Sequence, residues 1–281
     1  MRFFPALFPA LLLACAVNAR AATSPTLSDI AYGPDADQRY DFYRPAEGDR
    51  APLILMVHGG GWRRGDKDAA RVVDNKVDRW LPRGIAFASV NYRMQPKAPP
   101  LEQARDLARA LADVQHRAQK LGIDSDNIVL MGHSAGAHLV ALLAARPDLQ
   151  AAAGARPWRG SVLLDSGALD VPAIMNARHL RLYDRAFGGN PAEWTAASPF
   201  QQLGTTTAPI LAVCSSRRDD ACPQARAFVG KAVALGGRAE VLVEDKTHGE
   251  INYRLGADPD YTAAVEGFLG SLSPRLAERL R

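Results

Sequence analysis

Cysteine is scarce in this sequence, and long stretches of a single charge sign are missing from it. Three cysteines among 281 residues are too few for a disulfide scaffold or for a four-cysteine zinc site. The 34 basic residues nearly balance the 30 acidic residues and do not cluster, which argues against a nucleic-acid partner. Apolar residues make up 47% of the chain and charged residues 23%. The chain is therefore not that of a disordered protein, and it can build a buried core.

The first 22 residues have the pattern of an export signal. A basic start at Met1–Arg2 precedes an apolar run over 3–17 and the mostly small residues 19–22. These are the marks of a secretory signal peptide, which we predict at 1–21, followed by one domain at 22–281. The apolar run is short and contains two prolines, so it is a poor membrane span. We therefore expect a periplasmic or extracellular protein.

The segment Leu11–Cys15 leaves a second form of processing open, because it resembles a bacterial lipobox. In that case Cys15 would become the N-terminus and carry a lipid anchor in the outer envelope. Either form leaves Cys214 and Cys222, eight positions apart, as the remaining pair of thiols. In an oxidising compartment we expect this pair to form a disulfide, with two buried thiols as the alternative.

Short apolar runs alternate with segments that repeat apolar residues every three or four positions. The runs lie at 52–57, 85–90, 127–131, 161–164, 209–213 and 239–243. The helical segments lie at 101–121, 137–145, 225–235 and 263–272. Runs without polar alternation are typical of parallel strands covered on both faces, so we predict an α/β fold with a mostly parallel sheet. Residues 165–200 fit least well and are expected to form at most a small cap.

The sequence Gly132-His133-Ser134-Ala135-Gly136 directly follows the third apolar run. Glycines flank a serine in this way where a strand turns sharply into a helix, because larger side chains would clash there. We therefore predict that Ser134 is a nucleophile. The amide of Ala135 would lie at the N-terminus of the following helix, where it can face a developing negative charge.

Three glycines, Gly59–Gly61, follow the first apolar run, between His58 and Trp62. Because they have no Cβ atoms, the amides of Gly60 and Gly61 could approach a substrate oxygen closely. A phosphate-binding loop is the alternative, but the segment has neither a Gly-Lys-Ser/Thr ending nor a G-x-G-x-x-G pattern.

A serine hydroxyl needs a base, and the best candidate is His248. It follows the last apolar run, at the end of a predicted strand, where sites of parallel sheets are built. The other histidines suit structural or supporting positions: His58, His116, His133, His138 and His179. The base in turn needs a carboxylate. Asp219 and Asp220 both qualify, because they follow the run at 209–213 in the loop that the expected disulfide would brace.

The pairing of the glycine run with the motif around Ser134 resembles the α/β-hydrolase superfamily. Asn91-Tyr92-Arg93 and the segment 132–143 point to its carboxylesterase/lipase-like branch, which includes acetyl-xylan and feruloyl esterases and kynurenine formamidases. The resemblance spans residues 40–275. It implies these roles: Ser134 as nucleophile, His248 as base, Asp219 as acid, and the amides of Gly60, Gly61 and Ala135 as oxyanion hole.

The same resemblance favours Asp219 over Asp220, because the family often has a D-x-x-V-P pattern here, although Cys222 replaces the valine. It implies hydrolysis of a short-chain or small soluble carboxylic ester through an acyl-enzyme, without a metal or organic cofactor. The alternatives are an arylformamidase-type amidase, whose group also fits the glycine run, and an inactive hydrolase fold used for binding. Four aromatic residues could line the substrate pocket, although each is more often a core residue: Trp62, Tyr92, Trp194 and Tyr253.

Overall fold

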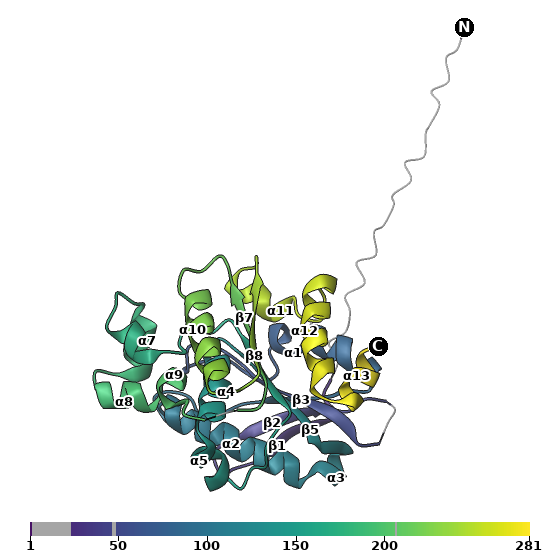
Figure 1. Ribbon diagram of the computed structural model, residues 1–281. Coiled ribbons are helices and arrows are strands. Elements are labelled where there is room, and N and C mark those ends of the chain that lie inside the picture. The colour runs from purple at the N-terminus through teal and green to yellow at the C-terminus, as the bar shows by residue number, and fades with distance from the viewer. Residues whose placement is uncertain (2–23, 47–48, 206) are drawn as a thin grey trace.

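The fold is built on one sheet of eight strands (Figure 1). The computed structural model describes residues 1, 24–46, 49–205 and 207–281. The strands follow the order β1-β2-β4-β3-β5-β6-β7-β8. The pairs β1–β2 and β2–β4 are antiparallel, and all the others are parallel. The predicted mostly parallel α/β sheet is therefore confirmed.

The elements have the following bounds. The strands are β1 Leu27–Ala31, β2 Arg39–Tyr43, β3 Ala51–Val57, β4 Ala86–Val90, β5 Ile123–His133, β6 Gly160–Leu164, β7 Ile210–Ser215 and β8 Ala239–Glu244. The helices are α1 Ala70–Trp80, α2 Pro100–His116, α3 Ala118–Leu121, α4 Ala135–Ala145, α5 Pro147–Ala152, α6 Val171–Met175, α7 Arg181–Phe187, α8 Pro191–Ala196, α9 Pro199–Gln202, α10 Ala221–Ala234, α11 His248–Tyr253, α12 Pro259–Leu272 and α13 Pro274–Leu280, with a 3-10 turn at Leu81–Arg83.

Side chains of the central strands alternate between two apolar layers. In β3, Leu53 and Leu55 belong to the layer that also contains side chains of α2, α4 and α10. Ile54 and Met56 belong to the opposite layer, which contains side chains of α1, α11, α12 and α13. Helices thus cover both faces of the sheet (Figure 1). This two-sided burial explains why the strands appear in the sequence as continuous apolar runs.

Every predicted strand and helix is present, with shifted ends. The helical segment 101–121 is divided into α2 and α3, and Gly122 ends it in a left-handed conformation at φ 71°. The antiparallel strands β1 and β2 and the helix α1 were not predicted. β1 is mostly exposed and β2 contains Arg39 and Asp41, so neither has the continuous apolar character of the parallel strands.

The segment 165–200 contains four short helices, α6 to α9, rather than an irregular loop. Side chains of Asp170, Asn190 and Ser198 accept hydrogen bonds from amides in the first turns of α6, α8 and α9. In Figure 1, α7 and α8 lie at one end of the molecule. This segment supplies part of the wall of the cavity described below.

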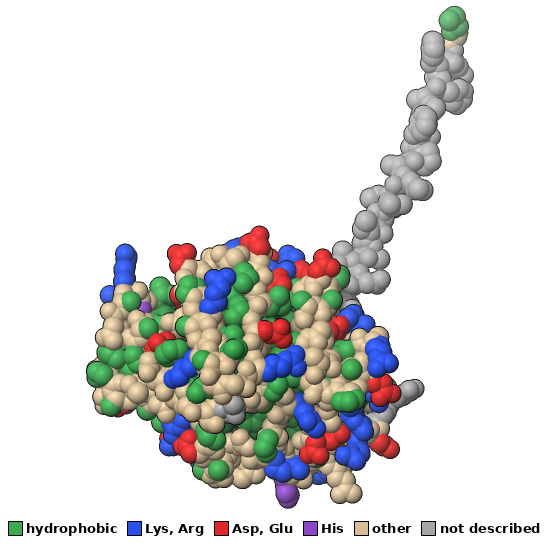
Figure 2. Space-filling view, viewed as in Figure 1, with side chains coloured by type: hydrophobic (Ala, Val, Ile, Leu, Met, Phe, Trp, Pro, Cys, Tyr) green, Lys and Arg blue, Asp and Glu red, His purple; other side chains and the backbone are tan. Residues whose placement is uncertain are grey.

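Among the described residues, no helix has the length and apolarity needed to cross a membrane. Apart from Met1, the predicted signal peptide at 1–21 lies outside the described residues, and so does Cys15. On the face shown in Figure 2, basic and acidic side chains are interspersed.

Candidate active site

Ser134 occupies the sharp turn between β5 and α4. Its backbone has φ 55° and ψ −117°, a strained conformation for a residue with a side chain. The neighbouring glycines are needed because other backbone segments approach them closely. A Cβ at Gly132 would lie 2.4 Å from the carbonyl oxygen of Gly136, and one at Gly136 would lie 2.2 Å from that of Val57. The sequence around Ser134 thus forms the tight strand-to-helix turn that its pattern predicted.

Three backbone amides near this turn have no hydrogen-bond acceptor among the described residues. They belong to Gly60 and Gly61 in the loop after β3 and to Ala135 at the start of α4. Gly60 has φ 130° and Gly61 φ 60°, values that glycine adopts readily. All three residues line the same cavity as Ser134. Their N–H groups are therefore available to an oxygen atom bound in that cavity.

Two aromatic residues hold the glycine loop in place. Tyr92 is fully buried, and its hydroxyl donates to the carbonyl of His58 at 2.9 Å while the two rings stack at 4.6 Å. Trp62 donates from Nε1 to Nδ1 of His138 at 3.1 Å. Burial lowers the pKa of His138 to about 4, so its ring is neutral and can accept this bond while Nε2 donates to Ala197. Of the two aromatics, Trp62 lines the cavity and Tyr92 belongs to the core.

His248, the first residue of α11, also lines the cavity. Its Nδ1 lies 2.6 Å from Oδ2 of Asp165, which directly follows β6. The carboxylate is fully buried, whereas the imidazole side chain is 40% exposed. Among the described residues, the Ser134 hydroxyl has no hydrogen-bond partner. Of the expected serine–histidine–carboxylate chain, the structure thus contains the link between histidine and carboxylate, with the serine in the same cavity wall.

The carboxylate beside His248 is not one of the two that the sequence favoured. Asp219 is exposed, and its side chain has no hydrogen bond or ion pair with any described residue. Asp220 pairs with Arg218 at 3.0 Å and is also exposed. The sequence-based expectation that Asp219, or else Asp220, lies beside His248 is therefore not met, and the carboxylate in contact with His248 is that of Asp165. Asp165 has a positive φ of 56°, which turns the chain sharply at the end of β6.

Three donors keep Asp165 ionised. Burial alone would raise its pKa, but the hydrogen bonds and positive charge around it outweigh that effect and lower the pKa below its usual value. The donors are His248, the guanidinium of Arg218, and the amide of Ser215 at 2.8 Å. An ionised carboxylate only accepts hydrogen bonds, so Nδ1 of His248 carries the proton of the hydrogen bond that joins them.

Arg218 is a member of the site that sequence analysis did not find. Its Nη1 lies 2.8 Å from Oδ2 of Asp165 and 2.9 Å from Nδ1 of His248. A guanidinium only donates, and Nδ1 already carries the proton shared with Asp165, so the contact with His248 brings two donors together. Arg218 therefore fixes the carboxylate and at the same time places a positive charge against the imidazole.

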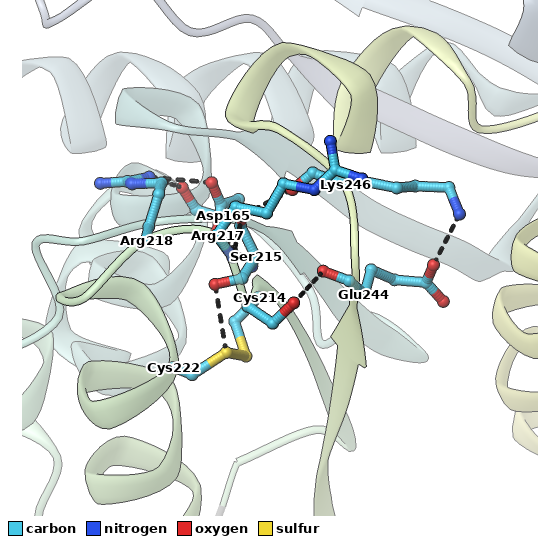
Figure 3. The surroundings of a disulfide bond; sticks show 9 residues. Asp165, Cys214, Ser215, Arg217, Arg218, Cys222, Glu244 and Lys246 are labelled. Atoms are coloured by element: carbon cyan, nitrogen blue, oxygen red, sulfur yellow. Dashed lines mark hydrogen bonds and ion pairs between the residues drawn. A yellow bond between two sulfur atoms is a disulfide. The ribbon is translucent and has the colours of Figure 1, made fainter.

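The loop that carries Arg218 is closed by a disulfide between Cys214 and Cys222 (Figure 3), whose Cα atoms are 5.1 Å apart. Cys214 lies in β7 and Cys222 in the first turn of α10. The expected disulfide is thus present. The loop that this disulfide closes contains Arg218, whose guanidinium contacts Asp165 (Figure 3), and not the carboxylate beside His248.

His133 holds the backbone of His248. Its Nε2 donates to the carbonyl of His248 at 2.9 Å, and the two rings lie 4.5 Å apart. Burial, together with the nearby charge of His248, lowers the pKa of His133 to about 3, so the ring stays neutral and keeps this donor. His133 and His138 thus occupy the supporting positions expected of them. His179 lies on the surface, where it pairs with Asp184, and His116 ends α2.

The cavity has a volume of about 550 Å³, a size typical of small-molecule sites. Of the four candidate aromatics, Trp62 lines it, and Trp194 and Tyr253, like Tyr92, lie outside it. The segment 165–200 also contributes residues to the cavity wall, among them Leu180, Leu182 and Tyr183. These residues were not predicted from the sequence. Within the described residues, no group of three or more His, Cys, Asp or Glu side chains is placed to hold a metal ion.

Comparison with known proteins gives several matches. The BD-FAE family model matches residues 40–157. The chain is 30% identical over 270 residues to esterase LipQ of Mycobacterium tuberculosis, a match that covers 88% of this chain and 63% of LipQ. It is 28% identical over 127 residues to kynurenine formamidase of Danio rerio, covering 45% and 41% of the two chains. This chain therefore spans less than two thirds of the length of these relatives.

A solved structure with the same fold is esterase B of Lactobacillus rhamnosis. The two structures superpose with a TM-score of 0.73, covering 92% of this chain and 89% of esterase B, at 20% sequence identity. At this level of identity the similarity establishes the fold alone.

Proposed function

We propose that the chain is a carboxylesterase-like α/β-hydrolase, as its similarity to the BD-FAE family model and to esterase LipQ supports, and that it hydrolyses carboxylic esters through a covalent acyl-serine. The proposed roles are nucleophile for Ser134, base for His248, acid for Asp165 and oxyanion hole for the amides of Gly60, Gly61 and Ala135. One observation carries the proposal: the 2.6 Å hydrogen bond between Asp165 and His248 lies at the cavity that contains Ser134 and the three amides without acceptors.

The reaction proceeds in two halves. Oγ of Ser134 attacks the ester carbonyl carbon while Nε2 of His248 takes its proton, and the three amides stabilise the resulting oxyanion. Collapse of this intermediate breaks the ester C–O bond, and Nε2 returns the proton to the leaving alcohol. Water then attacks the acyl-serine with Nε2 as base, which releases the carboxylic acid and restores Ser134. Asp165 stays ionised throughout and stabilises the imidazolium.

Substrate binding must bring Oγ of Ser134 and Nε2 of His248 into hydrogen-bond distance. Their hydrogen bond is missing without substrate, and such catalytic bonds often form only in the substrate complex. A rotation about the Ser134 side chain or of the 40% exposed imidazole supplies the movement. The hydrogen bond from His133 to the His248 carbonyl keeps the backbone of His248 fixed meanwhile.

The first test is hydrolysis of 4-nitrophenyl acetate and butyrate by the purified protein. Replacement Ser134→Ala should lower kcat by at least about 10⁴-fold, because the covalent route is lost. Ser166→Ala, which changes another serine of the cavity wall, should lower kcat less than tenfold. Equal losses in both variants would contradict the assignment of Ser134. A protein without turnover that also fails to react with a fluorophosphonate would instead be an inactive hydrolase fold used for binding.

A formamidase activity is the second candidate, because kynurenine formamidase of Danio rerio matches 45% of the chain. The same residues would attack a formamide carbonyl and expel an amine. Parallel assays of N-formylkynurenine and 4-nitrophenyl acetate separate the two functions. A kcat/KM for the formamide at least 100-fold below that for the ester supports the esterase, and the reverse order establishes the amidase.

We also propose that the natural substrates are short-chain or small soluble esters, since a cavity of about 550 Å³ holds a group of limited size. A profile over acyl length from acetate to dodecanoate, with acetylated xylan and methyl ferulate included, tests this. Turnover that falls steeply beyond hexanoate supports the proposal. Turnover that rises towards the longest chains would contradict it.

Export of the protein and a single domain at 22–281 are further parts of the proposal. The disulfide between Cys214 and Cys222 supports export, because such bonds persist in oxidising compartments. The mass of the mature N-terminus tests the form of processing. A chain that begins at residue 22 is the expected result, and a diacylated N-terminal Cys15 would establish the lipid-anchored form instead.

A further inference from the structure

The cavity that contains Ser134 is lined by arginines from four separate segments. Arg63 and Arg64 lie in the loop after β3, Arg71 in α1, Arg185 in α7 and Arg218 in the loop after β7. Their convergence is a property of the folded chain, because Arg63 and Arg218 are far apart in the sequence.

Four of these arginines have no ion-pair partner among the described residues. The side chains of Arg63, Arg64, Arg71 and Arg185 are exposed, and none has a hydrogen bond, ion pair or ring contact with a described residue. Arg218 differs, because it is paired with Asp165 and Asp220 as described above. An arginine guanidinium keeps its charge throughout the accessible pH range. The cavity therefore carries four permanent positive charges that form no ion pair with the part of the chain that the structure describes.

Negative charge in the cavity wall does not balance them. Asp66 is the acidic residue among those that line the cavity. Its carboxylate accepts a hydrogen bond from Asn91 at 3.1 Å, and the surrounding hydrogen bonds together with the charge of Lys67 outweigh burial and lower its pKa. One carboxylate against four guanidinium groups leaves a clear excess of positive charge. This contrasts with the interspersed charges on the face shown in Figure 2.

A concave surface lined by one charge sign attracts ligands of the opposite sign and raises their local concentration. Guanidinium groups also bind carboxylates through paired hydrogen bonds, which adds geometric selectivity to the attraction. Two exposed leucines line the same cavity, Leu180 at 64% and Leu182 at 36% exposure. Apolar surface beside unpaired arginines suits a molecule with a short apolar chain and an anionic end.

We propose that the natural substrates are esters that carry a carboxylate remote from the scissile bond, joined to it by a short apolar spacer. This inference rests on the proposed ester hydrolysis and adds the charge class of the substrate. The unpaired arginines bind the remote carboxylate, while Ser134 and the oxyanion-hole amides act on the ester group.

Matched substrates test the charge preference. The mono-4-nitrophenyl ester of adipic acid carries a carboxylate, and its methyl ester has almost the same length without the charge. A second pair, 4-acetoxybenzoic acid and its methyl ester, places the carboxylate on the alcohol side. We expect at least one of the charged esters to exceed its neutral counterpart in kcat/KM by tenfold or more. We also expect this ratio to fall as salt is added, because exposed charges are screened.

The double variant Arg71→Gln, Arg185→Gln assigns the preference to the arginines. Its kcat/KM should fall at least fivefold more for the charged ester than for the neutral one. The matched control is Arg226→Gln, because Arg226 is also exposed and unpartnered among the described residues but lies on α10 outside the cavity. In this control, the ratio of kcat/KM for the charged ester to kcat/KM for the neutral ester should equal that of the native protein. Two results would overturn the inference. One is a native protein whose kcat/KM is nearly equal for the charged and the neutral ester in both substrate pairs. The other is a double variant whose kcat/KM falls equally for both esters.

A binding measurement separates this inference from the proposed ester hydrolysis. Adipate should bind the Ser134→Ala variant, detected by calorimetry, and addition of the two arginine replacements should weaken that binding at least fivefold. If adipate binds but the native protein hydrolyses no ester, the proposed ester hydrolysis is contradicted and the anion site is supported. If the native protein hydrolyses neutral esters but shows neither a charge preference nor adipate binding, only the anion site is contradicted.

Discussion

Asp165 and His248 are joined by a 2.6 Å contact between Oδ2 and Nδ1, although 82 residues separate them in the chain and the loop after β7 offers two nearer aspartates. The carboxylate comes from the end of β6, the strand next to β5, which leads to Ser134. The chain order of serine, aspartate and histidine is the one that the resemblance to α/β-hydrolases predicts. The difference from the sequence-based expectation is that the carboxylate beside His248 follows β6 and not β7.

Replacement of Asp165 by asparagine should nearly abolish turnover. Without the carboxylate, the imidazole loses its fixed tautomer and the charge that stabilises the imidazolium, which costs about 10³–10⁴-fold in kcat in a serine triad. Asp219→Asn is the matched control, since Asp219 is exposed and has no partner among the described residues, and its kcat should change less than twofold. Steady-state assays with 4-nitrophenyl acetate measure kcat of both variants. A large loss in Asp219→Asn together with a small loss in Asp165→Asn would identify Asp219 as the acid.

Replacement of Arg218 by methionine should lower kcat. The guanidinium donates to Oδ2 of Asp165 at 2.8 Å and so holds the carboxylate that contacts His248. Without this charged hydrogen bond the carboxylate is less firmly placed against the imidazole, and we expect kcat to fall by about tenfold. Arg217→Met is the control, because Arg217 pairs with Asp245 on the surface. An unchanged kcat in Arg218→Met, or an equal fall of kcat in both variants, would contradict this function of Arg218.

The buried Lys76 should make the protein more stable as pH rises above neutrality. Its Nζ donates to the carbonyl and Oδ1 of Asn252 on α11, and burial lowers its pKa to about 7. An unfolded lysine titrates near about 10.4, so between the two values the unfolded chain binds a proton that the folded chain does not. The free energy of unfolding therefore rises across this window, by at most about 1.4 kcal/mol per pH unit.

Urea unfolding at pH 7, 8 and 9 measures this effect. The difference in free energy of unfolding between the native protein and Lys76→Met should grow with pH, because the variant lacks the titrating group. A difference that stays constant over these three values would show that Lys76 does not titrate in this range in the folded chain.

Removal of the disulfide should lower stability and loosen the loop of Arg218. The bridge closes a short loop, for which chain entropy gives a stabilisation of about 2–3 kcal/mol. The double variant Cys214→Ala, Cys222→Ala should show this loss in urea unfolding, and its kcat should fall as that of Arg218→Met does. Reduction of the native protein removes the same disulfide without a substitution, so it provides a second measurement of the loss. Unaltered stability in both would contradict a bracing function for the disulfide.

Local patterns predicted the parts of the fold that local physics decides. Each buried parallel strand is a continuous apolar run, and the turn at Ser134 requires its flanking glycines because of backbone contacts within 2.4 Å. The sequence could not identify the carboxylate that contacts His248, because Asp165 and Asp219 both follow predicted strands and therefore offer the same signal. Only the packed sheet decides which strand end faces His248.

The cluster of arginines in the cavity wall could not be predicted from the sequence either, because its members come from separate segments of the chain. Arg63, Arg71 and Arg185 belong to a loop, a helix that was not predicted and a segment expected to be irregular. Each of them alone looks like an ordinary solvated charge. Their common orientation towards one cavity follows from the packing of α1 and α7 around the glycine loop, and no spacing in the sequence encodes it.

Mass spectrometry of the protein after reaction with a fluorophosphonate tests the central claim most directly. We expect one phosphonyl adduct per chain, located on the peptide that contains Ser134, with the labelling rate strongly reduced in His248→Gln. An adduct on any other residue, or undiminished labelling of the Ser134→Ala variant, would contradict it.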